Sequence, residues 1–478
     1  MEIMKKTVPQ FNWNGIDLES LRQVMDKPAD DAVDAIYESK SMDKLVKLLT
    51  SMAENDSAVS SELPKPVRDF VKSELSIRFS AEDIALFNQT REIWEEKGTK
   101  FILILLFRAL PYTYMAEKPA NVLRMTKLLK TQAERRVFET AQFVFDVMDK
   151  NWWEPDQRGI LTALKVRIMH AAMRQVILDN DYGETWNEEW GKPISQEDLI
   201  ATNQVFSLEF FKGMELLGDP LTPEQQHAWF HTWKTIGRIM GVQDNLICNT
   251  VEEAWTLQHA VYDHLFRDEP VSGILLADAL VKALDNLYMP LKLVLILMKK
   301  MLEDDRYPDC FEQMLGPSYE KEFPELFVKP QSDDEKIDDK KHINENYHAQ
   351  LKEYHQILKD KKADFVKKKP NQGLVEYAKQ LVIRLLNLLQ NNKPLYEIHR
   401  DKLQIVLHLK DEESPVEELG EEVILESMSA LSGIVIGILA LHFREGKNSG
   451  FRIPKTLRAN WSRTGKRKKR WIWNTKIL

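Results

Sequence analysis

Two arginines and a histidine lie at helical spacing within an otherwise apolar stretch, GILTALKVRIMHAAMRQVILD, at residues 159–179. At about 100° per residue, Arg167 and Arg174 fall within about 20° of each other, and His170 falls about 60° away. Apolar residues take almost every other side, so this helix is expected to be buried. Burying the polar stripe without a partner would cost several kcal/mol per charge. An anionic group is therefore expected to meet it.

Two kinds of anionic partner would satisfy this stripe. Asp or Glu side chains from neighbouring helices would form a structural ion-pair network, and a buried histidine is most often a satisfied core residue. The other kind is an anionic cofactor that also needs an imidazole. Haem b has this chemistry, because its iron takes a histidine nitrogen and its two carboxylate side arms take arginines. The residues alone leave both alternatives open.

A second polar spot lies in the preceding stretch, AERRVFETAQFVFDVMD. Arg136, Glu139 and Thr140 stand at i, i+3 and i+4, so they share one helix face. Phenylalanines flank them in the sequence. The spot is either a local Arg136–Glu139 ion pair or the opposite wall of a pocket shared with His170.

These motifs form a recognisable pattern. The RxxHxxxR motif at 167–174, the RxxET motif at 136–140 and the segment GKPISQEDLIATNQVF at 191–206 resemble the oxygenase family of latex-clearing protein and the fungal mycophenolic-acid-pathway oxygenase. The resemblance covers residues 28–262. The segment RIPKTLRANW at 452–461 is similar to the way such chains end.

The resemblance implies an all-α, globin-like core that binds one haem b, with additional helices around it. It also implies an oxidoreductase that uses O2 to cleave a carbon–carbon double bond of a small apolar, isoprenoid or lipid-like substrate. The residues at matching family positions are the axial iron ligand His170, the haem-carboxylate or pocket residues Arg167 and Arg174, the pocket threonine Thr202, and the distal, catalytic candidates Arg136, Glu139 and Thr140.

Two departures from the family pattern bear on the activity. Glu139 stands where latex-clearing protein has a lysine that can cap the distal iron, and a carboxylate there could leave the site open or act as a base. The family's catalytic glutamate has Glu117 as its nearest match, while Ala120 takes the ungapped position. A haem-binding sensor or electron carrier without oxygenase chemistry, and a structural all-α protein without cofactor, are therefore kept as alternatives.

Helical periodicity dominates the chain, with no alternating strand pattern, which predicts an all-α protein. An acid-rich first turn, typical of a helix start, opens an amphipathic helix at 28–52. The other predicted helices are 101–110, apolar all round; 130–150; 159–179; a helix from the Ser195 cap to Leu217, stopped by Gly218; and a helix from the capping box Thr222-Pro223-Glu224-Gln225 toward Met240.

The length of 478 residues and shifts in composition divide the chain. Residues 1–328 are expected to form the haem-binding domain. Residues 329–372 are dense in Asp, Glu and Lys and predict a charged linker or helical insertion. Helices at 373–443 are expected to pack on the core, and 444–478 form a basic tail.

The charge pattern excludes a globally basic nucleic-acid-binding protein. The net charge is −8, whereas the tail from Arg444 to Leu478 holds 12 Lys and Arg against one acid. No secretory signal precedes the first predicted helix, so a cytoplasmic location is expected. Ser427–Phe443 has 17 residues without Asp, Glu, Lys or Arg, which favours a buried helix on length. The alternative is membrane association through this segment, with the tail contacting anionic lipid peripherally.

Other metal chemistry has little support in the sequence. Two cysteines, Cys248 and Cys310, exclude a disulfide framework and a cysteine-ligated iron–sulfur cluster. The absence of CxxCH excludes a covalently attached c-type haem. Two Glu-x-x-His pairs, Glu224 with His227 and Glu345 with His348, match the spacing of a di-iron bundle only weakly.

Overall fold

The computed structural model describes residues 16–37, 64–125, 139–179, 185–267, 270–286 and 291–327. Within these ranges every regular element is a helix, and the one isolated bridge joins Ala116 to Phe266. The predicted all-α fold class is therefore confirmed. The described residues up to 280 belong to one compact unit, and those from 281 onward belong to a second. The domain boundary expected at residue 328 stays a prediction, as do the segments after it, which lie outside the described residues.

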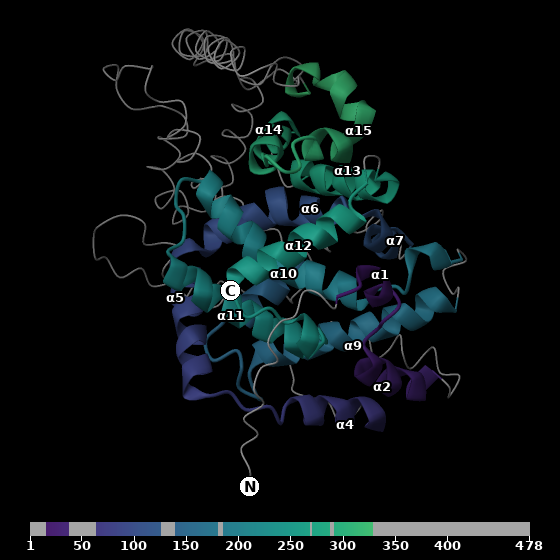
Figure 1. Cartoon of the computed structure of the whole chain (residues 1–478), viewed down its shortest axis with the longest axis vertical. Coiled ribbons are helices and arrows are strands. Elements are labelled where there is room, and N and C mark those ends of the chain that lie inside the picture. The colour runs from purple at the N-terminus through teal and green to yellow at the C-terminus, as the bar shows by residue number, and fades with distance from the viewer. Residues whose placement is uncertain are drawn as a thin grey trace, which may run out of the picture. The chain divides into compact units, whose positions relative to one another are not determined.

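The first unit holds most of the helices (Figure 1). Its elements are α1 (Leu18–Leu21), α2 (Lys27–Tyr37), α4 (Lys65–Glu74), α5 (Ala81–Ile104), the π-helix η2 (Leu105–Ala109), α6 (Leu110–Tyr114), α7 (Glu117–Met125), a helix at 139–147, α9 (Arg158–Leu178), η3 (Glu188–Trp190), α10 (Gln196–Leu216), α11 (Pro223–Ile239), η4 (Asp244–Leu246), α12 (Val251–Leu265) and α13 (Val271–Asn286), which continues into the second unit.

The core of this unit lies where α5, α10 and α11 meet. Aromatic rings fill it: the ring of Phe101 on α5 lies 4.9 Å from that of Phe210 on α10, which in turn lies 4.4 Å from Trp229 on α11. Gly213 lets α10 approach α5 closely, since a Cβ there would lie 2.6 Å from Ile104 Cγ2. Large rings packed in this way bury much apolar surface and give the helices a fixed relative placement.

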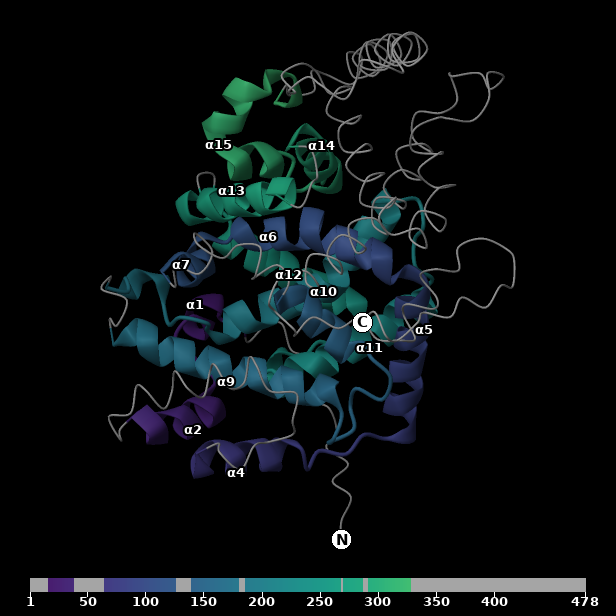
Figure 2. The same ribbon diagram turned by 180° about the vertical axis from the view of Figure 1, so that it is seen from behind.

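Helix α9 lies between two groups of helices in both views of the ribbon (Figures 1 and 2). Helices α2 and α4 run along one side of it, and α11 also contacts it. The segment that carries the predicted iron ligand is thus sandwiched within the unit.

Most helix starts that the sequence predicts are confirmed. Ser195 and Asp198 form a capping box at the start of α10, and Thr222 with Gln225 does the same for α11. Gly218, at φ 67°, follows the end of α10, a backbone conformation that suits glycine.

The predicted helix 101–110 differs in its boundaries. It is buried, but it forms the end of the long helix α5 and continues through the π-helix η2 into α6. The helix predicted at 28–52 is described only to residue 37, and the one predicted at 130–150 only from residue 139.

The second unit contains α14 (Leu291–Met301), α15 (Cys310–Glu322) and η5 (Pro324–Leu326). Lys299 joins these elements, because its Nζ donates a hydrogen bond to the carbonyl of Leu326 and lies 5.7 Å from the ring centre of Phe311. Across the described ranges, no helix is both long and apolar enough to cross a bilayer. The segment Ser427–Phe443 lies outside those ranges.

Candidate functional site

Arg167 lies at the centre of a buried ion-pair network. Its Nε and Nη2 donate to the two carboxylate oxygens of Asp26, at 2.6 Å and 2.9 Å, in a bidentate pair. Its Nη1 donates to Glu74 Oε2 at 3.0 Å and to the carbonyl of Ile239 at 3.1 Å. Burial acts to lower the pKa of Arg167, but the bonds and charges of Asp26 and Glu74 outweigh it, so the pKa is raised. The guanidinium therefore stays charged in the interior.

Arg174 is paired in the same way two turns further along α9. Its Nε and Nη2 lie 2.7 Å and 2.6 Å from Asp30 Oδ1, and its Nη1 donates to the carbonyl of Ile194 at 3.3 Å. Both partners are buried. Burial raises the pKa of Asp30 to about 6, against the lowering effect of Arg174.

The polar stripe of α9 thus meets the carboxylates of Asp26, just before α2, of Asp30 on α2 and of Glu74 on α4. This is the ion-pair network that the sequence left open as one of two alternatives. The prediction that Arg167 and Arg174 hold haem carboxylates stays a prediction, and both guanidiniums already have protein carboxylates as partners.

His170 lies between these two ion pairs, three residues after Arg167 and four before Arg174. The residue is half-buried, and its Nδ1 atom is buried. Helix α9 carries many buried apolar residues of its own, such as Ile168 and Ala171, which confirms that it is an interior helix. The two arginines fix α9 on either side of the imidazole.

The segments with the two predicted threonines meet at an aromatic contact. Phe143, in the helix at 139–147, lies with its ring 6.3 Å from that of Phe206 on α10 and 6.3 Å from that of Trp233 on α11. Thr140 lies about one turn before Phe143, and Thr202 about one turn before Phe206.

The exposure of the predicted site residues varies. Thr140 is half-buried, while Glu139 and Thr202 are exposed. Arg136 lies outside the described residues, so neither of the two alternatives for Arg136 and Glu139 is decided.

Glu117, the nearest match to the family's catalytic glutamate, has a structural task. Its Oε2 accepts hydrogen bonds from the backbone N–H of Ser272 at 2.8 Å and of Gly273 at 3.4 Å, in the first turn of α13. The Ser272 hydroxyl donates to Asn121 on the same helix as Glu117. Glu117 therefore caps α13. Ala120, at the ungapped position, is buried and offers no acid.

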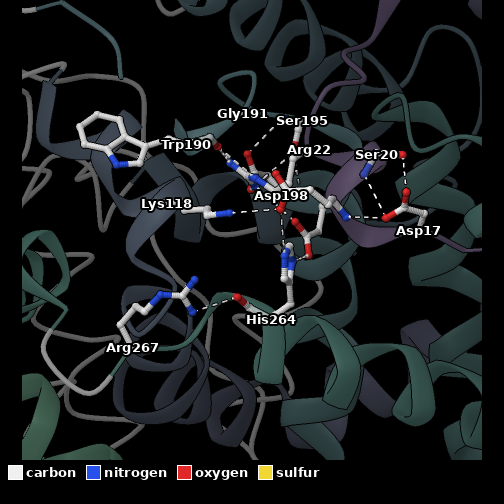
Figure 3. A network of polar contacts seen from close by, with 12 residues as sticks. Asp17, Ser20, Arg22, Lys118, Trp190, Gly191, Ser195, Asp198, His264 and Arg267 are labelled. Atoms are coloured by element: carbon white, nitrogen blue, oxygen red, sulfur yellow. Dashed lines mark hydrogen bonds and ion pairs between the residues drawn. The ribbon is translucent and has the colours of Figure 1, made fainter. Parts of the chain in front are cut away.

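A second polar network, which the sequence analysis did not identify, joins α1, α10 and α12 (Figure 3). The buried Arg22 donates to Ser195, to Asp198 and to the carbonyl of Trp190. Beside it, Glu197 Oε1 lies 2.7 Å from His264 Nδ1. Burial raises the pKa of Glu197 to about 7, although His264 and Arg22 act to lower it. Only the Ser195–Asp198 capping box had a local sequence signal.

A third network lies inside the core and was also missed. Arg108, on the π-helix, donates from Nε to Glu209 Oε2 at 2.6 Å, and Tyr262 OH donates to Glu209 Oε1 at 2.8 Å. All three side chains are buried. Burial raises the pKa of Tyr262 well above its ordinary value, and the Glu209 charge adds to this. The hydroxyl therefore stays protonated and serves as a donor.

The described Glu-x-x-His pair does not lie where a di-iron site would need it. Glu224 and His227 are both exposed on α11, whereas di-iron ligands project into a bundle core. Glu345 and His348 lie outside the described ranges. Among the residues that the structure covers, no three His, Cys, Asp or Glu side chains gather as a metal site would need.

Part of the chain is similar to known oxygenases. Residues 101–319 match the family model described as ER-bound oxygenase mpaB/B'/Rubber oxygenase, catalytic domain. The chain is 25% identical over 268 residues to a rubber oxygenase of Streptomyces sp. (strain K30), which covers 54% of this chain and 62% of that protein. The structure of latex clearing protein in the closed state has a similar fold, with a TM-score of 0.53, 21% identity, and coverage of 65% of this chain and 82% of that one.

Proposed function

Because residues 101–319 match a family model of oxygenase catalytic domains, we propose that the protein is a haem b-dependent oxygenase acting on an apolar, unsaturated isoprenoid or lipid-like substrate. The proposed reaction is oxidative cleavage of a carbon–carbon double bond with O2. The chain spans 62% of the length of the rubber oxygenase that it matches. The activity of the whole protein is therefore part of the proposal.

His170 is the observation that carries this proposal. It is an imidazole on an interior helix of the matched domain, with its Nδ1 atom buried and the residue as a whole half-buried. Imidazole is a common axial donor for haem iron. The side chain therefore fits the ligand that haem b needs. Arg167 and Arg174 pair with protein carboxylates, so they help to hold α9 in place, and contact of either guanidinium with the haem carboxylates is a further part of the proposal.

The distal groups would come from the helix at 139–147 and the residues before it. Bound haem would supply the redox chemistry that activates O2. The Thr140 hydroxyl can donate a hydrogen bond there, Arg136 can stabilise negative charge, and Glu139 can accept or return a proton. Thr202 would contribute a further hydroxyl from α10. Phe143 and Phe206, whose rings lie 6.3 Å apart about one turn after these threonines, are apolar groups suited to a hydrocarbon chain.

A haem-binding sensor or electron carrier is the second candidate, and the position of Glu117 favours it. The Glu117 carboxylate accepts hydrogen bonds from the first turn of α13, which gives it a structural task and no assigned catalytic one. Glu139 also replaces the family's lysine. Both candidates share the haem site and differ only in whether substrate is oxidised.

Absorption spectra test the haem site first. The full-length protein, supplied with haem, should show a Soret band that shifts on reduction, and His170→Ala should remove the protein-specific spectrum. His227→Ala is the matched control, because this histidine lies exposed on α11 of the same domain. An unchanged spectrum in His170→Ala would remove the axial assignment.

Oxygen uptake then separates the two candidates. The oxygenase should consume O2 when short polyisoprene oligomers or unsaturated lipids are added, and carbonyl products should appear in the mass spectrum. A haem-loaded protein that consumes no O2 with either substrate class supports the sensor or electron carrier.

The proposed location is cytoplasmic, with the basic tail 444–478 touching anionic lipid at the membrane surface. Cosedimentation of the full chain with phosphatidylserine vesicles, compared with phosphatidylcholine vesicles, tests this contact. Release at high salt is expected for a peripheral, electrostatic contact. Retention after alkaline washing would instead indicate insertion through 427–443.

A further inference from the structure

Residues 17–37 form a segment, here termed the N-terminal strap, that lies outside the matched catalytic domain and contacts α9 inside it. Three acidic residues of the strap, Asp26, Asp30 and Asp34, stand at i, i+4 and i+8, so they share one face. They meet Arg167, Arg174 and Gln175 in the same order along the two segments. The strap therefore contacts the helix that carries His170 at three polar positions.

The two ion pairs of the strap lie one on each side of His170 along α9. The Asp26–Arg167 pair lies about one turn before the imidazole, and the Asp30–Arg174 pair about one turn after it. Because both pairs are buried, removing Asp30 would leave the Arg174 guanidinium without its carboxylate, and removing Asp26 would leave Arg167 with Glu74 alone; both changes are unfavourable in the interior. Helix α9 can avoid that cost only by moving, and the imidazole would move with it.

The backbone at Gly241 lies directly against the Asp26–Arg167 ion pair. Gly241, at φ 96° just after α11, lies so close that a Cβ there would overlap with Asp26 Oδ2 and lie 2.9 Å from Arg167 Nε. The carbonyl of Gly241 accepts a hydrogen bond from Gln196 Nε2 at 3.0 Å, and the Gln196 backbone N–H donates to the carbonyl of Val24 in the strap at 2.8 Å. The strap is thus built into the ends of α10 and α11 as well as into α9.

We propose that Asp26 and Asp30 are positioning residues for the haem site, which hold His170 at the height and rotation that axial ligation requires by clamping α9 through Arg167 and Arg174. This inference rests on the proposed haem function. Groups that orient metal ligands from behind commonly change metal affinity by about 10–100-fold when they are removed. Here the orientation is applied through the helix backbone.

Asp26→Asn and Asp30→Asn test the inference against Asp31→Asn as the matched control. Asp31 lies on the same helix and pairs with Lys27 at 2.6 Å, but both side chains are exposed. In hydrogen exchange of the full-length protein without haem, peptides within 158–178 should exchange at least about tenfold faster in the two test variants than in the control. Equal exchange in all three variants would overturn the clamping of α9.

The haem-loaded proteins provide a second readout. Haem transfer to apomyoglobin should be at least about tenfold faster in Asp26→Asn and Asp30→Asn than in Asp31→Asn. The iron–histidine stretching band of the reduced protein, measured by resonance Raman, should shift or broaden only in the two test variants. General loss of stability would not move this band in the molecules that remain folded. Unchanged transfer and an unchanged band would overturn the inference.

Failure of the proposed function can be told apart from failure of this inference. A wild-type protein that takes up no haem refutes the haem function, and the exchange measurement then decides the clamp alone. If an Asn variant does not fold, Asp30→Glu takes its place, because it keeps the charge and displaces the carboxylate by one methylene. Asp30→Glu should change the exchange rate of 158–178 and the iron–histidine band in the same direction as the Asn variants. If neither quantity changes, the proposal is contradicted.

Discussion

Glu197 Oε1 lies 2.7 Å from His264 Nδ1, and the Glu197 side chain has no exposed surface. Burial raises the pKa of this carboxyl from 4.5 to about 7, so it takes up a proton near neutral pH in the folded protein. Its stabilising contribution is complete below about pH 4.5 and is lost as the pH rises through about 7.

The pH dependence of stability should therefore change in Glu197→Gln. Glutamine does not ionise. The difference in the free energy of unfolding between pH 5 and pH 8 should therefore be smaller in the variant than in the wild type, by up to about 3 kcal/mol. Urea unfolding at several pH values measures this. Wild type and variant with parallel profiles would show that another group titrates in this window.

The core network of Arg108, Glu209 and Tyr262 predicts unequal costs of substitution. Glu209→Ala should destabilise the protein by about 3–5 kcal/mol, because it leaves the Arg108 guanidinium buried without its carboxylate. Tyr262→Phe removes one hydrogen bond to a charged group and should cost about 1.5–3 kcal/mol. Chemical unfolding gives both values, and a Tyr262→Phe cost that exceeds that of Glu209→Ala would reverse the proposed order.

Gly241→Ala should lower the melting temperature more than Gly218→Ala does. Both glycines have positive φ, which costs an alanine about 1–3 kcal/mol. Only at Gly241 would the new Cβ also overlap with the Asp26–Arg167 pair. Differential scanning calorimetry of the two variants measures the difference. Equal shifts would mean that the ion pair can move aside without cost.

Glu117 should act as a helix cap and not as a catalytic acid. Glu117→Ala should cost about 0.5–2 kcal/mol of stability, the usual range for loss of a cap. Glu117→Gln should recover most of this, since its amide oxygen can still accept from Ser272 and Gly273. Oxygen uptake per haem-loaded molecule should persist in Glu117→Gln, and its complete loss there would restore the catalytic assignment.

Local signals in the sequence predicted local structure well. The Ser195–Asp198 and Thr222–Gln225 capping boxes act within four residues, so the starts of α10 and α11 could be predicted directly. The burial of α9 also followed from its composition, because apolar residues on nearly all sides leave no solvent face.

Partners from distant parts of the chain had no such signal. Asp26 is 141 positions before Arg167, and Asp30 is 144 before Arg174. In the sequence, the acids at the start of α2 look like an ordinary favourable first turn. The stripe on α9 predicted that an anionic group must meet it, but not which one. The π-helix with Arg108 likewise depends on tertiary packing, since its residues read as a continuous apolar helix.

The position of residues 17–37 on α9 also bears on how the catalytic domain can be produced. The region that sequence similarity identifies, 101–319, is smaller than the unit that folds. A fragment that begins after residue 37 would keep α4 and α5 but leave two guanidiniums in the interior with neither aspartate, so it should aggregate on expression. Adding the first 37 residues as a separate peptide should restore solubility, which would make this a domain that can be assembled from two pieces.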